Sequence, residues 1–98
     1  MKQKLIEAAT NQDIDAVRYI KIDMPKTEIR AALIEAAADQ NADAVYYIKI
    51  DMPDFEIRAA LIEAEQGENT IARNFIISTI EDTFISGELI NSDNSELS

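Results

Sequence analysis

The sequence predicts an all-α protein that is built as a short stack of helix-turn-helix repeats and closed by a longer C-terminal helix. Three observations predict this class. The sequence Leu-Ile-Glu-Ala-Ala of residues 5–9 returns at 33–37 and begins again at Leu61, which gives a period of 28 residues. The sequence Tyr-Ile-Lys-Ile-Asp-Met-Pro occurs at both 19–25 and 47–53. Apolar residues recur at helical spacing, and a fixed period of this length is typical of repeats that bury their apolar faces against their neighbours.

The first repeat predicts two helices, over 3–10 and 14–22, because the polar residues between them favour a turn. Pro25 disfavours helical backbone at the residue before it, so the second helix is expected to end near Ile22. The Asp-Met-Pro sequence then starts a new helix, since aspartate caps free N–H groups and proline is tolerated in a first turn. The same signals predict the following helices, over 26–38, 42–50 and 54–65.

The third copy differs from the first two and predicts the C-terminal cap. Asn69 and Thr70 offer N-caps to a long helix over 69–86 with a broad apolar face, and Gly87 is expected to end it. The final unit of a repeat stack is atypical because one of its sides meets water. The predicted divisions are one domain over 1–90, repeats at about 5–32, 33–60 and 61–86, and a tail over 91–98 with a disordered composition.

Each repeat resembles the helical part of an ankyrin repeat. Residues 5–9 and 11–20 resemble that family's inner helix, turn and outer helix, and 33–48 match about as well. The third copy keeps a smaller set of matching residues: Leu61, Ala64, Ala72, Phe75 and Ile76. The resemblance covers about residues 4–77 and implies a short right-handed α-solenoid that binds proteins.

The sequence also departs from the ankyrin pattern. The usual Thr-Pro-Leu-His opening is absent, Gln12 and Gln40 replace the turn glycine, and the period is about five residues shorter than the family's 33. The missing residues would form the projecting β-hairpin finger. The resemblance therefore implies a partner surface on the inner helices and their entry loops. Other two-helix repeats, or a compact bundle made by duplication, are alternatives.

The composition argues against an enzyme. The chain has no histidine and no cysteine, so the commonest general base, transition-metal ligand and nucleophile are missing. Its two glycines cannot make a Gly-rich phosphate loop. Equivalent glutamates such as Glu7 and Glu35 are expected in ion pairs rather than at a metal. Repeated ion pairs are also expected from basic residues that recur with Glu28 and Glu56: Lys21, Lys49, Arg30 and Arg58. We expect no cofactor and no metal.

The charge and the start of the chain bound its partners and its compartment. The net charge is −10, and both nucleic acids and anionic membranes require clustered Lys and Arg. Direct binding to either is therefore not expected. The Met-Lys-Gln-Lys start leads into no signal-peptide apolar core, and no apolar run is long enough to span a bilayer. We expect a cytoplasmic protein.

The first hypothesis for function is a small acidic adaptor or inhibitor that binds another protein through its inner helices. Residues 6–33 and 34–61 are identical at 21 of 28 positions, and positions that differ are free to address a partner. Tyr46 and Phe55 are the expected anchors, since exposed aromatic residues often dominate interfaces. Tyr19 and Tyr47 are expected in the core. The predicted partner-binding residues are Arg18, Lys26, Thr27, Tyr46, Asp54 and Phe55.

Two alternatives remain open. The first is self-assembly into a homodimer or a head-to-tail contact, because two and a half repeats are close to the minimum for a stable stack. Its predicted contact residues are Leu5, Ile14 and Val17, which we expect to be exposed on the first hairpin. The second is mimicry, in which carboxylates imitate nucleic-acid phosphates and inhibit a DNA- or RNA-binding protein.

Overall fold

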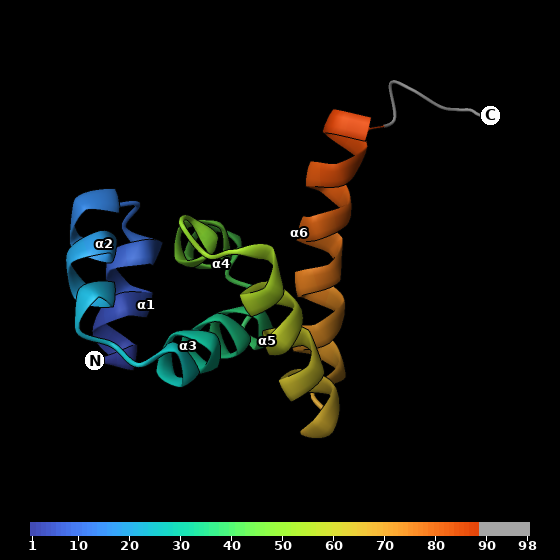
Figure 1. Ribbon diagram of the computed structural model, residues 1–98, viewed down its shortest axis with the longest axis horizontal. Helices are drawn as coiled ribbons and strands as arrows, with labels where there is room; N and C mark the ends of the chain where they lie inside the picture. Colours follow the sequence, from blue (N-terminus) through green and yellow to red (C-terminus); the bar gives the residue numbers. More distant parts are fainter. Residues whose placement is uncertain (89–98) are drawn as a thin grey trace.

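The computed structural model describes residues 1–88, with side chains described through residue 80. The described chain is all-α, as predicted (Figure 1). Its helices are α1 (Lys2–Thr10), α2 (Ile14–Ile22), α3 (Lys26–Ala38), α4 (Ala42–Lys49), α5 (Asp54–Gln66) and α6 (Thr70–Glu88). Each predicted boundary lies within about two residues of the observed one. Gly87 does not end the last helix, which continues to Glu88, and the predicted tail at 91–98 lies outside the described residues.

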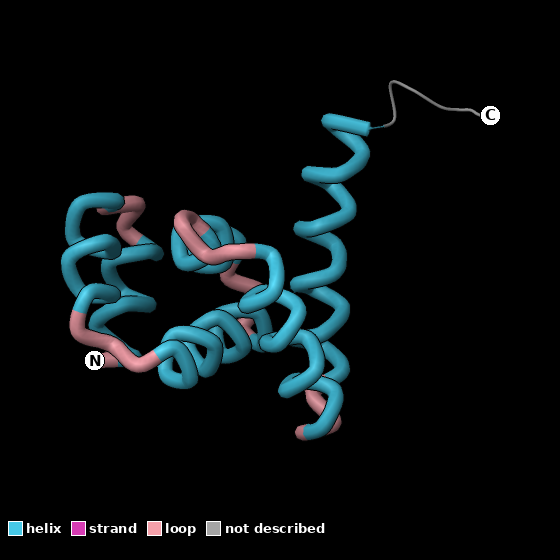
Figure 2. The backbone as a smooth tube through the Cα atoms, in the orientation of Figure 1, coloured by secondary structure: helices cyan, strands magenta, loops and turns pink. Residues whose placement is uncertain are grey.

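The helices pack as three successive hairpins that share two layers. The inner helices, α1, α3 and α5, lie next to one another in chain order, and each packs against the outer helix of its own hairpin. In addition α1 packs against α4, and α3 packs against α6. Each inner helix except the last is therefore held between its own outer helix and the next one. Figure 2 shows that the connections are short, and Figure 1 shows the long α6 at the end opposite α1 and α2.

The core consists of equivalent residues from successive repeats. Its largest fully buried side chains are Leu5, Val17, Leu33, Val45, Ile48 and Ile76. Buried alanines such as Ala9 and Ala37 lie between them and let the helix axes approach closely. The prediction that Leu5 and Val17 are exposed is therefore wrong, because α4 packs over α1 and covers the first hairpin. Ile14 is partly exposed.

Each hairpin turn contains a residue with left-handed backbone. The φ angle is 59° at Gln12, 56° at Gln40 and 57° at Glu68. These are the middle residues of three equivalent turns, at positions where glycine is usually favoured. Gly67 in the third turn has φ −87° and lies one residue before the left-handed position. In the third turn the left-handed position that favours glycine is therefore occupied by Glu68, and Gly67 precedes it.

The same turn ends one helix and begins the next. In the second repeat the Gln40 N–H donates to the Ala37 carbonyl and the Asn41 N–H donates to the Ala36 carbonyl, each at 3.0 Å. These two bonds form a Schellman motif. The Asn41 side chain then accepts a hydrogen bond from the Ala44 N–H at 3.2 Å, so it is the N-cap of α4. Three residues thus satisfy both helix ends, which explains the sharp reversal in each hairpin.

Gln40→Gly is expected to raise the free energy of unfolding by about 0.5–1 kcal/mol, because glycine adopts left-handed backbone without the steric cost that glutamine bears. Urea denaturation of the variant and the wild type measures the change. Gly67→Ala is the matched control. An added Cβ at Gly67 would meet the Glu63 carbonyl oxygen at 3.5 Å, an ordinary contact, so alanine is also expected to stabilise. A loss of stability in Gln40→Gly would contradict this account of the turn.

The two Asp-Met-Pro linkers have the same sequence and different backbones. The φ angle is −96° at Asp23 and 67° at Asp51. Arg18 Nε lies 2.8 Å from Asp51 Oδ2, so an ion pair from the preceding hairpin accompanies the left-handed residue. α2 continues to Ile22, whereas α4 ends one position earlier, at Lys49. The neighbouring hairpin, rather than the local sequence, distinguishes the two linkers.

Candidate functional site

A buried cation joins the last two inner helices. Arg30 on α3 lies between two glutamates of α5: its Nη1 is 2.6 Å from Glu56 Oε1, and its Nε is 2.6 Å from Glu63 Oε2. The Arg30 side chain is 15% exposed and that of Glu56 is 12% exposed. The hydrogen bonds that Arg30 donates, first to Glu56 and then to Glu63, raise the pKa of Arg30 above its ordinary value. The expected recurrence of Arg30 with Glu56 as an ion pair is confirmed.

The first two inner helices are joined in the same way one period earlier. Lys2 Nζ lies 2.8 Å from Glu35 Oε1, and the Lys2 backbone N–H donates to Glu28 Oε2 at 3.1 Å. Gln3 Nε2 also donates to Glu35, at 2.7 Å. The hydrogen bond from Lys2, followed by that from Gln3, lowers the pKa of the Glu35 carboxyl. α3 and α5 thus each present two glutamates, seven residues apart, to the inner helix before them.

In the third member of this series, no later inner helix within residues 1–88 packs on the equivalent face. Arg58 on α5 is equivalent to Lys2 and Arg30, yet its side chain is 74% exposed, and its ion pair is with Asp54 of the same helix at 3.4 Å. Ile62 is 55% exposed, whereas its equivalents Ile6 and Ile34 are partly buried against the core. The face of α5 that corresponds to a joined face on α1 and α3 is therefore uncovered.

We call this surface the open α5 face and define it by Phe55, Arg58 and Ile62. Their spacing of three and then four residues places them on one side of the helix. Phe55 is 68% exposed, so two large apolar side chains flank a cation on the same surface. The burial of an exposed Phe or Ile side chain is worth about 1.5–3 kcal/mol, so this face can contribute substantially to binding.

The outer helices are joined by lysines that bind backbone or hydroxyl oxygens instead of glutamates. Lys21 Nζ donates to the Ile48 and Ile50 carbonyls, at 2.8 and 2.6 Å, which lie at the end of α4. Lys49 Nζ donates to Thr79 Oγ1 at 3.0 Å. Desolvation lowers the pKa of both lysines. The prediction that Lys21 recurs with glutamate partners is therefore wrong.

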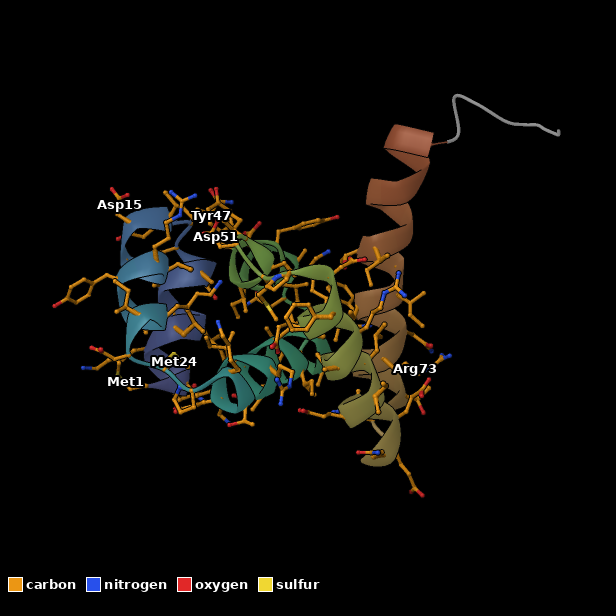
Figure 3. All side chains as sticks on the ribbon, viewed as in Figure 1. Met1, Asp15, Met24, Tyr47, Asp51 and Arg73 are labelled. Carbon is orange, nitrogen blue, oxygen red and sulfur yellow. The ribbon has the colours of Figure 1, made fainter. Side chains whose placement is uncertain are left out.

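The far end of the stack carries an ion pair at positions that are apolar in the earlier repeats. Glu65 is equivalent to Ala9 and Ala37, which are fully buried. Arg73 is equivalent to the fully buried Val17 and Val45. Arg73 Nε lies 2.6 Å from Glu65 Oε2, and Figure 3 shows Arg73 on α6 at the opposite end of the molecule from Met1. The first two repeats therefore bury an alanine and a valine at these two positions, under the next hairpin. The third repeat has an ion pair there that is exposed to water.

The predicted partner-binding residues lie on four different helices, from α2 to α5. Arg18 is paired with Asp51, and Lys26 helps to line a cavity of about 30 Å³ that Asp51 also lines, so both lie beside the second linker. Tyr46 is 42% exposed, with Lys49 Nζ 5.6 Å from its ring centroid. The remaining predicted residues lie in the first turns of α3 and α5: Thr27, Asp54 and Phe55, all exposed.

Among the predicted residues, Phe55 alone belongs to the open α5 face. Sequence comparison missed Arg58 and Ile62, because both are identical to the residues one repeat earlier and were grouped with the stack. The signal that identifies them is the end of the repeat array rather than a sequence difference. The prediction that Tyr19 lies in the core is wrong, because its side chain is 75% exposed. Tyr47 is partly buried against the core, as predicted.

A hollow of about 510 Å³ in the surface is lined by polar and charged residues: Glu65, Glu68, Asn69, Thr70 and Arg73. Small-molecule sites are usually lined mostly by apolar and aromatic side chains, so this hollow does not resemble one. The part of the chain that the structure describes has no group of three potential metal-ligating residues of the types His, Cys, Asp and Glu. No helix within residues 1–88 combines the length and the apolar character needed to cross a membrane.

Comparison of the chain with protein-family models, with curated proteins and with solved structures gives no match. The resemblance to ankyrin repeats therefore stays a prediction from the residues quoted above. The site is defined by the geometry of the repeats alone.

Proposed function

We propose that this protein is a non-enzymatic protein-interaction module, a small acidic adaptor or inhibitor with a right-handed, ankyrin-like stack of repeats. Its partner binds the inner-helix layer at the open α5 face. The observation that carries the proposal is the exposure of Arg58 and Ile62, at positions whose equivalents join neighbouring inner helices in the earlier repeats. A face with the composition of a helix–helix interface, left uncovered, is a surface that a second protein can complete.

The energetics of the face support a binding role. Phe55 and Ile62 present apolar area, and the Arg58 guanidinium has only a weak, solvent-exposed pair with Asp54. A partner carboxylate therefore replaces a poor interaction with a charge-assisted hydrogen bond. Aromatic and arginine side chains are also the residue types that most often dominate interfaces.

The proposal is tested by cross-linking capture from a lysate of the source cells, followed by measurement of the affinity of the purified partner. Phe55→Ala is expected to weaken that affinity by about tenfold or more, because it removes the largest apolar side chain of the face. Tyr19→Ala is the matched control, since it removes an exposed aromatic residue from the other end of the stack. Equal affinity for the wild type and Phe55→Ala, with the fold intact by circular dichroism, would remove the proposed surface.

A homodimer is the second candidate function. Tyr19 and Ile22 on α2 are each 75% exposed, which places an apolar patch at the N-terminal end of the stack. Light scattering on a size-exclusion column, over roughly a hundredfold range of concentration, distinguishes the two functions. A mass that rises with concentration and is restored to the monomer value by Ile22→Asp would favour self-association through α2. A constant monomer mass would favour a different protein as the partner.

A further inference from the structure

We infer that the open α5 face binds an amphipathic α-helix of another protein that carries two carboxylates seven residues apart, with small residues between them. This inference rests on the proposed function and names the chemistry of the partner. It follows from the fold itself, because the faces of α1 and α3 that are equivalent to the open α5 face are each covered by another helix of the chain. α3 covers it on α1, and α5 covers it on α3.

The two internal examples share one chemistry. α3 presents Glu28 and Glu35 to Lys2, and the chain between these glutamates includes the buried Ala32. α5 presents Glu56 and Glu63 to Arg30, with the equivalent alanine, Ala60, also fully buried. The alanines allow the helix axes to approach. The two glutamates of α5 lie on either side of the Arg30 guanidinium, whereas Glu35 contacts the Lys2 ammonium and Glu28 accepts from the Lys2 backbone N–H. A partner helix with two glutamates seven residues apart and small residues between them could contact Arg58 and Ile62 as α5 contacts α3.

A second copy of this chain fits the face less well than another protein does. Its N-terminal inner helix, α1, has Glu7 at the position of the second glutamate. Gln3 and Lys4 stand where α3 has Ala31 and Ala32, so α1 presents long polar side chains in place of small ones. The paired glutamates of α3 and α5 are already engaged by Lys2 and Arg30. The occupant is therefore a helix from a different protein.

The probe is a hydrocarbon-stapled peptide with the sequence of residues 54–66 and the substitutions Phe55→Gln, Arg58→Gln and Ile62→Gln, so that only its glutamate face is presented. The control peptide carries Glu56→Gln and Glu63→Gln in addition. NMR titration of the full chain follows the Ile62 methyl groups and the Arg58 Nε–H. Saturable shifts at both residues are expected, with the control peptide weaker by about tenfold, because it lacks both partners of the guanidinium.

Two protein variants complete the test. Arg58→Gln is expected to weaken the glutamate peptide by about tenfold and to leave the weak affinity for the control peptide unchanged. Lys4→Gln, which removes an exposed cation from α1, is expected to bind like the wild type. Equal affinity for the two peptides, or shifts centred away from α5, would overturn the inference. If a captured partner depends on Phe55 while the glutamate peptide fails to bind, the proposed function stands and the carboxylate-helix chemistry is wrong.

Discussion

Replacement of Leu33 by alanine is expected to lower the free energy of unfolding by about 3–4 kcal/mol. Leu33 is fully buried in α3, the helix that packs against α1, α4, α5 and α6. The loss combines the transfer free energy of the removed atoms with a cavity that four surrounding helices cannot readily fill. A domain of this size is commonly stable by only about 5–10 kcal/mol, so the midpoint of urea denaturation should fall markedly.

The repeats supply a matched control for this prediction. Leu61 is the same residue at the same position one repeat later, but it is only partly buried, because no further hairpin among the described residues covers α5. Leu61→Ala is therefore expected to cost about half as much as Leu33→Ala. If the two variants lost equal stability, the last repeat would be as well enclosed as the middle one, and the open α5 face would not exist.

Arg30→Ala is expected to lower the free energy of unfolding by about 2–3 kcal/mol. The substitution removes both charge-assisted contacts between α3 and α5 and leaves the Glu56 carboxylate, 12% exposed, without its cationic partner. The penalty for an unpaired, largely buried carboxylate is the main cause of the loss. Urea denaturation at neutral pH measures the effect.

Arg58→Ala is the control, because it deletes the equivalent arginine from a position where the side chain is 74% exposed. The expected change is about 0.5 kcal/mol or less, as for most exposed ion pairs. The addition of Glu56→Gln to Arg30→Ala should recover part of the stability, since it removes the stranded charge. If Arg58→Ala lowered the free energy of unfolding as much as Arg30→Ala, burial between α3 and α5 would not be the cause of the loss. The repeat position of the arginine would then determine it.

The secondary structure was predictable because its signals are local and repeated. The polar turn residues and the Asp-Met-Pro linkers bound the helices in the sequence, and the observed helices begin and end close to those signals. The absence of glycine from the first two turns was also visible. What the sequence did not show is that Gln12 and Gln40 adopt the left-handed backbone themselves. Side-chain hydrogen bonds and the Schellman geometry stabilise the turn without a glycine at that position.

Burial was harder to predict because it depends on which hairpin covers which. Leu5 and Val17 were expected to be exposed at an uncapped N-terminal end, but α4 reaches back over α1 and buries both. Tyr19 and Tyr47 begin the same seven-residue sequence, yet Tyr19 is exposed, whereas Tyr47 lies on α4, which packs against the preceding hairpin. Identical residues therefore differ in exposure according to their place in the array.

The same reasoning explains why the candidate site was only partly predictable. A comparison of the two full copies draws attention to positions that differ, and it found Phe55 in this way. Arg58 and Ile62 are invariant between the copies, so such a comparison assigns them to the scaffold. They belong to an exposed surface because no inner helix among the described residues packs on this face of α5.

The ion pair between Glu65 and Arg73 has a consequence for how such a chain can change in evolution. The polar ending of the stack is confined to the last repeat, while the units before it meet one another through nearly identical residues. An in-frame duplication of residues 33–60 would therefore insert a hairpin whose neighbours on both sides are already compatible with it. The protein can grow by whole repeats from within, and the original terminal repeat would still close each longer descendant.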